Sequence, residues 1–297
     1  MNRENPVVFP DGAPLRDLVA RALAEDVGTG DATTAVTVDP ASVVQGEIRA
    51  RTAGVVAGLP LLPLVFGALD GGVVVTGIST DGDPVAPGEV VARLAGPAQA
   101  ILTGERTALN FLQYLSGIAT GTAAHVRAVA GTGCRVLDTR KTLPGWRALA
   151  KYAVRCGGGY NHRMGLYDRI MLKDNHWLAG GGDVASLVAR ARRLYPDLMV
   201  EVEVDELAQL SMVLPLGVEW ILLDNFTVEA VAQAVALRDT AGVATRLEVS
   251  GNVNLQTIGD YAVAGADAVS VGCLTHSVQA LDLGLDLQRP AGEGSGP

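Results

Sequence analysis

Five side chains between positions 140 and 173 have the chemistry needed to bind a small polyanion. They are Arg140, Lys141, His162, Arg163 and Lys173. Guanidinium forks and ammonium groups that converge on carboxylates or phosphates form strong, charge-assisted hydrogen bonds. Either arginine alone could be a surface ion pair, and His162 alone could be an ordinary loop histidine. Together they favour an anion site in which His162 donates to the ligand, with its charge state left open.

The distribution of charge supports a local anion site. The 297 residues carry 23 lysines and arginines against 32 aspartates and glutamates, a formal net charge of −9. Residues 135–173 nevertheless hold six arginines and all three lysines of the chain against two aspartates. The simpler alternative is a solvated basic helix face. A basic segment in an acidic protein suits a small anion, so we expect no nucleic-acid or anionic-membrane partner.

Two carboxylates, Glu203 and Asp224, come at the ends of apolar runs that we predict to be strands. Carboxylates in that position can hold Mg²⁺ or bind ribose hydroxyls. The alternative is that both form buried ion pairs with the basic residues. Glu201 points to the same face of its strand as Glu203, so periodicity leaves the choice between them open.

Glycines precede two predicted helix starts late in the chain. One lies in the sequence Ser-Gly-Asn at 250–252, and the other is Gly272, between Val271 and Cys273. Exposed backbone N–H groups at a helix N-terminus in such loops bind phosphate. Each glycine could instead be only a turn residue. The pair together predicts a phosphate subsite.

Alternating strands and helices must position these residues. Apolar runs typical of buried parallel strands cover 135–138, 170–173, 199–204, 220–224, 247–250 and 268–272. Helix patterns lie between them, over 144–156, 183–195, 205–214, 227–240 and 254–264. Such repeats predict a parallel sheet, either doubly wound or closed as a barrel. Polar residues at successive strand ends favour a βα barrel, and six strands instead of eight predict an incomplete one.

The first 115 residues have a different pattern. A helix over 15–25 precedes short β-rich runs over 43–50, 54–57, 73–77 and 90–94. Glycines and prolines separate these runs, which predicts a smaller α+β domain ending near a helix over 105–115.

The remaining features concern the environment of the chain. No run of residues is suited to span a bilayer, and the first residues lack the pattern of a secretion signal. Cys134, Cys156 and Cys273 have no metal-ligand spacing and suit a reducing cytosol, so we expect a cytoplasmic protein. The tail after 289 is expected to be disordered.

Longer stretches of this sequence resemble the quinolinate phosphoribosyltransferase family. They are DTRKTLPGWRALAKYAVRCGGGYNHRMGLYDRIMLKDNH, EVEVDELAQL, ILLDNF, LEVSGNV and VSVGCLTHSVQALDLGLDL. The resemblance implies an N-terminal α/β sandwich over 1–115 and an open barrel of six to seven strands, carrying the active site, over 116–275. It implies that the C-terminal segment, 276–297, returns to the N-terminal domain. It also implies a homodimer.

The resemblance implies an enzyme, a pentosyltransferase of NAD biosynthesis. Such an enzyme transfers phosphoribosyl from phosphoribosyl pyrophosphate (PRPP) to quinolinate with decarboxylation, and uses Mg²⁺. The products are nicotinate mononucleotide, pyrophosphate and CO₂.

The resemblance also implies roles for individual residues. Arg106, in GERTALN, would reach the partner subunit's site. Residues expected around quinolinate and the neighbouring phosphate oxygens are Thr139, Arg140, Lys141, His162, Arg163 and Lys173. Glu203 and Asp224 would hold ribose and Mg²⁺, directly or through water or substrate, and with Lys141 they form the predicted catalytic set. Residues expected at the 5′-phosphate loops are Ser250, Gly251, Asn252, Val271, Gly272 and Cys273.

Three other functions fit parts of the pattern. A related phosphoribosyltransferase could use nicotinate or serve molybdenum uptake. A Schiff-base aldolase could use Lys173 or Lys141 on a barrel strand. A protein with the same scaffold could bind anions without catalysis.

Overall fold

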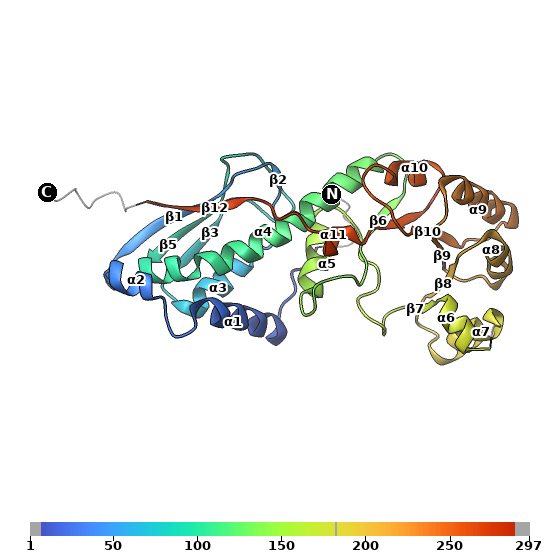
Figure 1. Cartoon of the computed structure of the whole chain (residues 1–297), viewed down its shortest axis with the longest axis horizontal. Helices are drawn as coiled ribbons and strands as arrows, with labels where there is room; N and C mark the ends of the chain where they lie inside the picture. The colour runs from blue at the N-terminus through green and yellow to red at the C-terminus, as the bar shows by residue number, and fades with distance from the viewer. Residues whose placement is uncertain (1–6, 182, 289–297) are drawn as a thin grey trace. The chain divides into compact units, whose positions relative to one another are not determined.

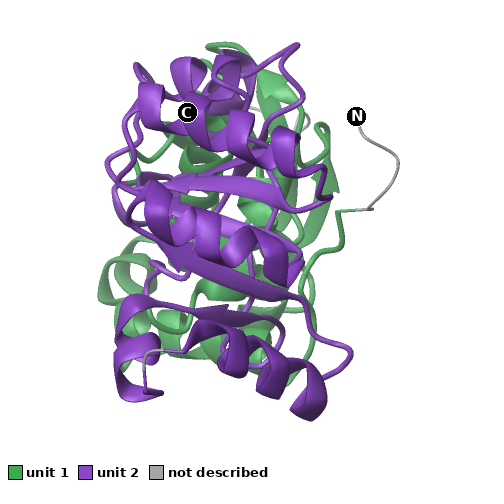
Figure 2. Ribbon diagram, turned by 90° about the vertical axis from the view of Figure 1, so that its right-hand side faces the viewer, with its two compact units in different colours: residues 1–121, 144–158, 278–297 green, residues 122–143, 159–277 purple. Residues whose placement is uncertain are grey.

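The computed structural model describes residues 7–181 and 183–288, which fall into two compact units (Figure 2). Unit 1 comprises residues 1–121, 144–158 and 278–297, and unit 2 comprises residues 122–143 and 159–277. The sequence placed residues 144–158 in the barrel domain, whereas they cluster with unit 1. The reason is aromatic packing, because the ring of Trp146 stacks on Phe111 with 4.8 Å between centroids. The predicted disordered tail lies outside the described residues.

Unit 1 is built on an antiparallel sheet with the strand order β12-β1-β5-β3. These strands are β1 (Val43–Ala50), β3 (Val74–Gly77), β5 (Val90–Pro97) and β12 (Leu283–Gln288). A separate pair joins β2 (Gly54–Val55) to β4 (Pro84–Val85). The C-terminal strand β12 pairs along β1, with Gln45 opposite Gln288. The end of the described chain therefore forms part of the N-terminal sheet.

The helices of unit 1 gather on one side of this sheet (Figure 1). They are α1 (Ala13–Val27), α2 (Ala32–Thr37), α3 (Leu61–Leu69) and the first part of α4 (Ala98–Ala128), while α5 (Arg147–Cys156) also belongs to unit 1 but lies beyond the end of the sheet. Gly104 lets α4 approach α3 closely, because a Cβ there would lie 2.9 Å from side-chain atoms of Phe66 and Leu69. Glycine has a low helix propensity, and close packing of this kind compensates for it in α4, which contains several glycines among its 31 residues.

Unit 2 contains a parallel six-stranded sheet with the order β6-β11-β10-β9-β8-β7. The strands are β6 (Arg135–Leu137), β7 (Ile170–Leu172), β8 (Val200–Val204), β9 (Trp220–Asp224), β10 (Arg246–Ser250) and β11 (Ala268–Ser270). The helices between or after them are α6 (Asp174–Ala179), α7 (Val184–Leu194), α8 (Leu207–Val213), α9 (Val228–Ala241), α10 (Ile258–Val263) and α11 (Cys273–His276), with a 3₁₀ turn at Leu214–Leu216. The predicted parallel sheet is therefore confirmed, and each strand lies within two residues of its predicted bounds.

Alternation along the strands separates two faces of the unit 2 sheet. Residues such as Val202, Leu223 and Val249 join the buried core, together with apolar side chains of α7 to α10. Residues one position away point to the opposite face. On that face Leu137 and Trp220 belong to a small apolar cluster. Polar side chains follow further along the same strands, so the second face is where a site can form.

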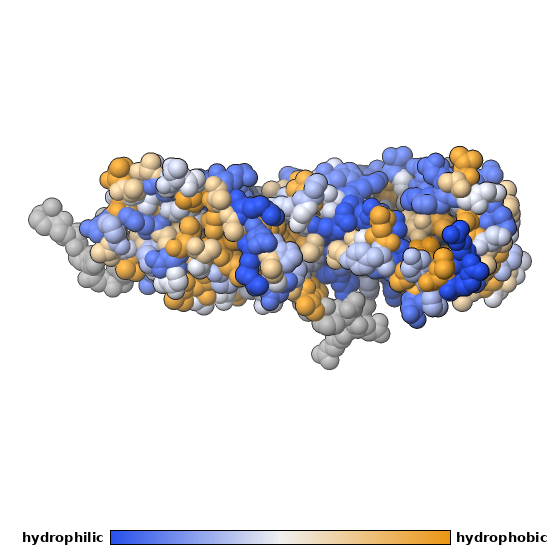
Figure 3. Space-filling view, turned by 90° about the horizontal axis from the view of Figure 1, so that it is seen from below, coloured by the Kyte–Doolittle hydropathy of each residue, from blue (hydrophilic) through white to orange (hydrophobic). Residues whose placement is uncertain are grey.

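The surface mixes apolar and hydrophilic residues (Figure 3). Exposed apolar side chains such as Val36 and Leu178 lie in different units. Scattered exposed apolar residues are ordinary on proteins and mark no partner by themselves. Among the described helices, none combines the length and apolar character needed to cross a membrane.

Candidate active site

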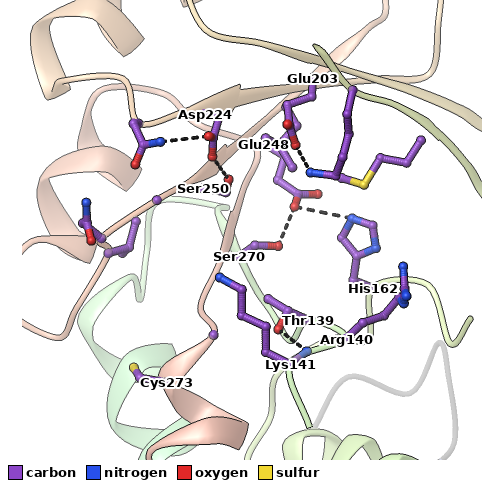
Figure 4. A pocket seen from close by; sticks show the side chains of 18 of the residues that line it. Thr139, Arg140, Lys141, His162, Glu203, Asp224, Glu248, Ser250, Ser270 and Cys273 are labelled. Carbon is purple, nitrogen blue, oxygen red and sulfur yellow. Dashed lines mark hydrogen bonds and ion pairs between the residues drawn. The ribbon is translucent and has the colours of Figure 1, made fainter. Parts of the chain in front are cut away.

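A pocket of about 690 Å³ opens in unit 2 where the parallel strands end (Figure 4). It is lined by residues that the sequence analysis singled out: Thr139, Arg140, Lys141, His162, Arg163, Lys173, Glu203, Asp224, Ser250, Gly251, Asn252, Gly272 and Cys273. The structure therefore brings basic, acidic and glycine-containing segments together in one cavity.

Two predicted site residues lie elsewhere. Val271 is buried, and its side chain belongs to the core of unit 2, so only its backbone could face a ligand. Arg106 lies on α4 within unit 1. Its expected place in a partner's site stays a prediction.

Sequence reasoning missed several residues of the pocket lining. They are Met171, Leu222, Asn225, Glu248, Val253, Asn254, Ser270 and His276. A signal was available for three of them. Leu222, Glu248 and Ser270 stand two residues before Asp224, Ser250 and Gly272, and residues two apart on a strand share a face.

Lys173 and Glu203 form an ion pair across strands β7 and β8. Lys173 begins α6 and donates its backbone N–H to His176 Nδ1 at 3.0 Å, which fixes the start of that helix. Burial raises the pKa of Glu203, the Lys173 ammonium opposes that shift, and the Asp224 carboxylate adds to it. The net pKa of Glu203 is raised. The carboxylate end of the pocket is therefore partly neutralised by a lysine of the same unit.

Two guanidinium groups, Arg140 and Arg163, line the same pocket. Burial lowers the pKa of Arg163, and the positive charge of Arg140 lowers it further. Like charges held at one site repel each other, and an anion bound between them relieves that repulsion. The arrangement therefore favours a ligand with negative charge at this end of the pocket.

The loop after β6 carries Arg140 and Lys141 and is tied to α11. Thr275 Oγ1 donates to the backbone carbonyl of Lys141 at 2.7 Å, and the backbone N–H of Lys141 donates to Thr139 Oγ1 at 3.0 Å. Figure 4 shows the Lys141 side chain extending into the pocket. Both ends of this short segment are thus held by hydrogen bonds within unit 2.

Asp224 is held by donors from its own loop and from β10. Ser250 Oγ donates to Asp224 Oδ1 at 2.7 Å, and Asn225 Nδ2 donates to Asp224 Oδ2 at 2.8 Å. A Cβ at Gly251 would lie 2.1 Å from Asn225 Oδ1, and the φ of Gly251 is +96°. Glycine is therefore required at 251 for both space and backbone conformation. Asn252 also has a positive φ, of +51°, so the chain turns sharply after β10.

His162 is fixed on three sides by the protein. Its backbone N–H donates to Asp138 Oδ1 at 2.9 Å, and its Nδ1 accepts the backbone N–H of Arg163 at 2.6 Å. Its Nε2 lies 3.1 Å from Glu201 Oε2 and 3.5 Å from Glu248 Oε1. We expected His162 to donate to the anion, whereas in this structure both ring nitrogens are engaged by protein groups.

Glu201 and Glu203 occupy different depths of the same face. Glu203 lines the pocket, while Glu201 is completely buried beside His162 and Arg169. Burial alone would raise the pKa of Glu201, but hydrogen bonds from His162 and Arg169 bring it below its ordinary value. Glu203 is therefore the member of this pair that can meet a ligand.

Both domains of one protein family match this sequence. Residues 31–116 match the N-terminal domain of quinolinate phosphoribosyl transferase, and residues 118–286 match its C-terminal domain. The chain belongs to the quinolinate phosphoribosyltransferase family. Among curated relatives, the nicotinate-nucleotide pyrophosphorylase [carboxylating] of Mycobacterium leprae is 47% identical over 277 residues, covering 92% of this chain and 96% of the relative. The probable enzyme of that name from Bacillus subtilis is 40% identical, covering 92% of this chain and 93% of the relative.

Solved structures of quinolinate phosphoribosyltransferase family relatives share the fold. The nicotinate-nucleotide pyrophosphorylase of Francisella tularensis superposes with a TM-score of 0.89 at 36% identity, covering 96% of this chain and 99% of that one. NadC from Streptococcus pyogenes gives a TM-score of 0.87 at 42% identity, covering 94% and 99%. The human nicotinic acid phosphoribosyltransferase shares the fold alone, with a TM-score of 0.59 at 14% identity, covering 93% and 74%.

Proposed function

We propose that this chain transfers phosphoribosyl from PRPP to quinolinate and releases CO₂, forming nicotinate mononucleotide and pyrophosphate for NAD biosynthesis. One observation carries the proposal within the family. A single pocket gathers the cations Arg140, Lys141, Arg163 and Lys173 with the carboxylates of Glu203, which pairs with Lys173, and Asp224. This is the charge pattern that a dianionic acceptor and a phosphorylated sugar together require.

Quinolinate binds at the cationic side of the pocket in this proposal. Its two carboxylates are anchored by Arg140, Arg163 and Lys141, with Thr139 and His162 completing the wall. Lys173 is shared between the substrate and Glu203. Nicotinate has one carboxylate fewer, so it would leave part of this positive charge unmatched. The number of cations therefore favours the dicarboxylate over nicotinate.

The phosphoribosyl group binds at the opposite side. Glu203 and Asp224 accept hydrogen bonds from ribose hydroxyls. The 5′-phosphate is held by the loops that follow β10 and β11, which contribute Ser250, Gly251, Asn252, Gly272 and Cys273 and the backbone of Val271. Close approach of backbone to phosphate is possible where glycines replace side chains.

The reaction needs positioning more than covalent catalysis. The bond between ribose C1 and the pyrophosphate oxygen breaks, and its electron pair leaves with pyrophosphate. The lone pair of the pyridine nitrogen then forms the new bond to C1. Glu203 and Asp224 stabilise the positive charge that develops on the sugar, while Lys141 holds the ring in line.

Decarboxylation follows from the charge on the ring. Once the nitrogen is a pyridinium, the bond between C2 and its carboxylate breaks and CO₂ leaves. The electron pair stays at C2, where the neighbouring positive nitrogen stabilises it until a proton is added. The cations of the pocket hold the remaining carboxylate, so the product keeps its position in the pocket.

Mg²⁺ fits the donor set at this side of the pocket. Glu203 and Asp224 offer carboxylate oxygens from the ends of adjacent strands, and oxygen is the ligand type that Mg²⁺ prefers. Two carboxylates leave ligand positions for water and diphosphate oxygens. When bound, Mg²⁺ neutralises charge on the departing pyrophosphate. Glu203 and Asp224 are the residues that would hold it.

We propose three further properties. The parallel sheet, whose order begins at β6 and ends at β7, curves as an open barrel around the pocket. The enzyme is a homodimer in which Arg106 reaches the partner's site. It works in the cytoplasm, where the free thiols Cys134, Cys156 and Cys273 stay reduced.

A turnover assay tests the proposed activity. Purified protein is given PRPP, Mg²⁺ and either quinolinate or nicotinate, and CO₂, pyrophosphate and nicotinate mononucleotide are measured. We expect equal amounts of all three products with quinolinate and little product with nicotinate. Product formed from nicotinate but not from quinolinate would indicate the related phosphoribosyltransferase that uses nicotinate. Binding of PRPP without release of pyrophosphate would indicate an anion-binding protein.

A Schiff-base aldolase fits this geometry poorly. Lys173 is engaged in an ion pair with Glu203, whereas a Schiff-base lysine must present its nitrogen to the carbonyl carbon of a substrate. Borohydride trapping of a lysine adduct would overturn this conclusion.

A further inference from the structure

A buried polar cluster surrounds the His162 ring at the wall of the pocket, and the proposed reaction assigns no role to its two glutamates. Arg169 donates to Glu201 Oε2 at 3.2 Å, and Ser270 Oγ donates to Glu248 Oε1 at 2.5 Å. Both glutamates are fully buried, and their nearer oxygens face His162 Nε2. Figure 4 shows Glu248 between Ser270 and His162. Such a costly arrangement of buried carboxylates calls for a function.

The proton on the His162 ring can be placed from its partners. The backbone N–H of Arg163 is a donor only, and it lies 2.6 Å from His162 Nδ1. Nδ1 must therefore accept, so it carries no proton. Nε2 lies 3.1 Å from Glu201 Oε2, closer than the 3.5 Å that separates it from Glu248 Oε1 and from the Arg169 guanidinium. Its nearest neighbour is therefore an acceptor, so Nε2 donates to Glu201 and carries the proton of a neutral imidazole. The geometry points to the Nε2–H tautomer of His162.

The Nε2–H tautomer leaves no lone pair on Nε2 for a metal at this cluster. His162, Glu201 and Glu248 each place one potential ligand atom within 4.8 Å of the others. A metal on Nε2 would need the lone pair there, and Nδ1 would then carry the proton. That proton would point at the Arg163 N–H, which is also a donor. Arg169 already neutralises the negative charge of Glu201. The proton on His162 Nε2 therefore occupies the place that a metal ion would take.

Glu248 is the carboxyl group of the cluster that binds its proton more tightly than usual. Burial raises its pKa well above the ordinary value, and the neighbouring Glu201 carboxylate raises it further. Among the described residues, Oε2 of Glu248 has no hydrogen-bond partner. A neutral Glu248 beside an ionised Glu201 avoids two adjacent negative charges under a pocket for anions.

We propose that Glu201, Glu248 and Ser270 are positioning residues that hold His162 in its Nε2–H form and, through Nδ1, fix the backbone of Arg163. The chain of contacts runs from β8, β10 and β11 through His162 to the loop that presents the Arg163 guanidinium. Glu248 and Ser270 also line the pocket, whereas Glu201 does not and can act only through the residues around it. The inference rests on the proposed function only in naming quinolinate as the anion that Arg163 binds.

Nitrogen-15 NMR of the histidine rings tests the tautomer directly, without turnover. The signals of His162 are assigned by their loss in His162→Gln. We expect one protonated nitrogen, Nε2, and one unprotonated nitrogen, Nδ1. A proton on Nδ1, on both nitrogens, or a metal retained at this site on elemental analysis would overturn the proposal.

Kinetics of Glu248 variants test the positioning role. Glu248→Ala removes the carboxyl group beside His162 Nε2, so the ring and the Arg163 backbone that it contacts are held less firmly. We expect the KM for quinolinate to rise about tenfold. The KM for PRPP should change less than about twofold, because Arg163 lies on the quinolinate side. Glu248→Gln keeps an uncharged group of the same shape and should restore the KM for quinolinate.

Thr245→Val is the matched control for lost stability. Thr245 precedes β10 and donates its buried hydroxyl to Val218 O at 2.8 Å, so the variant loses a buried hydrogen bond of the same unit. We expect it to lower the Tm without changing either KM. The positioning role would be overturned if Glu248→Ala raised the KM for quinolinate and the KM for PRPP equally. It would also be overturned if Thr245→Val raised the KM for quinolinate as much as Glu248→Ala does. If wild type makes no nicotinate mononucleotide, the proposed function fails, while the NMR result still decides the tautomer.

Discussion

Arg140 is the residue whose loss should separate substrate recognition from folding most clearly. It is exposed in the loop after β6 and lines the pocket, so the core does not depend on its side chain. Replacing Arg140 with Gln removes a charge-assisted hydrogen bond, which contributes about 1.5–3 kcal/mol. We expect kcat/KM for quinolinate to fall about 10- to 150-fold while the Tm stays near wild type.

Arg192→Gln is the matched control for that change. Arg192 is also an exposed arginine, but it donates to the carbonyls of Leu216 and Gly217 on the helical side of unit 2. Its replacement should leave kcat/KM unchanged. An Arg140→Gln enzyme with the kinetics of wild type would remove Arg140 from the site.

The raised pKa of Glu248 predicts how the free energy of unfolding depends on pH. Its raised pKa means that the folded state binds its proton more tightly than the unfolded chain does. Folding stability from this group is therefore present at low pH and is lost as the pH rises from about 4.5 toward the folded pKa, by at most about 1.4 kcal/mol per pH unit. Glu248→Gln has no such loss. Urea unfolding should show Glu248→Gln gaining on wild type as the pH rises, and a constant difference would contradict the assignment.

Residue types predicted much of the pocket lining, but not the depth of each residue. Glu201 and Glu203 share a strand face, so their alternation cannot tell which one reaches the ligand. The structure separates them because His162 and Arg169 enclose Glu201, and those residues come from a loop distant in sequence. Glu248 was missed for a related reason. It lies inside a run of apolar strand residues, and its only signal is that it stands two residues before Ser250 on the same strand face.

The loop that ends β10 should control PRPP binding. Gly251 combines a φ of +96° with close contact to Asn225, so a methyl group at 251 must displace the loop. We expect Gly251→Ala to raise the KM for PRPP at least about tenfold, because the phosphate-side backbone moves. Steady-state kinetics with varied PRPP measure this effect.

Gly242→Ala controls for the backbone conformation alone. Gly242 ends α9 with a φ of +64°, and a Cβ there would meet no atom within 4 Å. Its replacement should cost about 1–2 kcal/mol of stability without changing the KM for PRPP. Equal kinetic effects from the two variants would show that the Gly251 loop does not bind the phosphate.

Elements that obey a local pattern were predicted well, and those that depend on distant contacts were not. The strand over 220–224 was placed with its observed bounds because its apolar run and final aspartate are unambiguous. Helix α4 was predicted only over 105–115, although it covers Ala98–Ala128. Its glycines weaken the local signal, yet Gly117 is needed there because a Cβ would lie 2.3 Å from Gln279 O. Strand β12 is specified by its pairing with β1, which the sequence of β12 alone does not reveal.

At the scale of the assembly, the proposed dimer predicts complementation between inactive variants. Arg106→Gln and Arg140→Gln would each lack one part of every site when assembled alone. In a mixed dimer, one site receives both wild-type residues. After subunits are mixed and exchanged at equal concentration, we expect about a quarter of wild-type activity to return. Activity that stays at the level of the separate variants would show that Arg106 does not serve the partner.

The whole account depends on a pocket whose cations match a ligand with two negative charges. Calorimetric titration of the wild-type protein with quinolinate and with nicotinate measures that match most directly. Since each charge-assisted contact contributes about 1.5–3 kcal/mol, we predict that quinolinate binds at least about tenfold more tightly than nicotinate. Equal affinities for the two acids, or tighter binding of nicotinate, would contradict it.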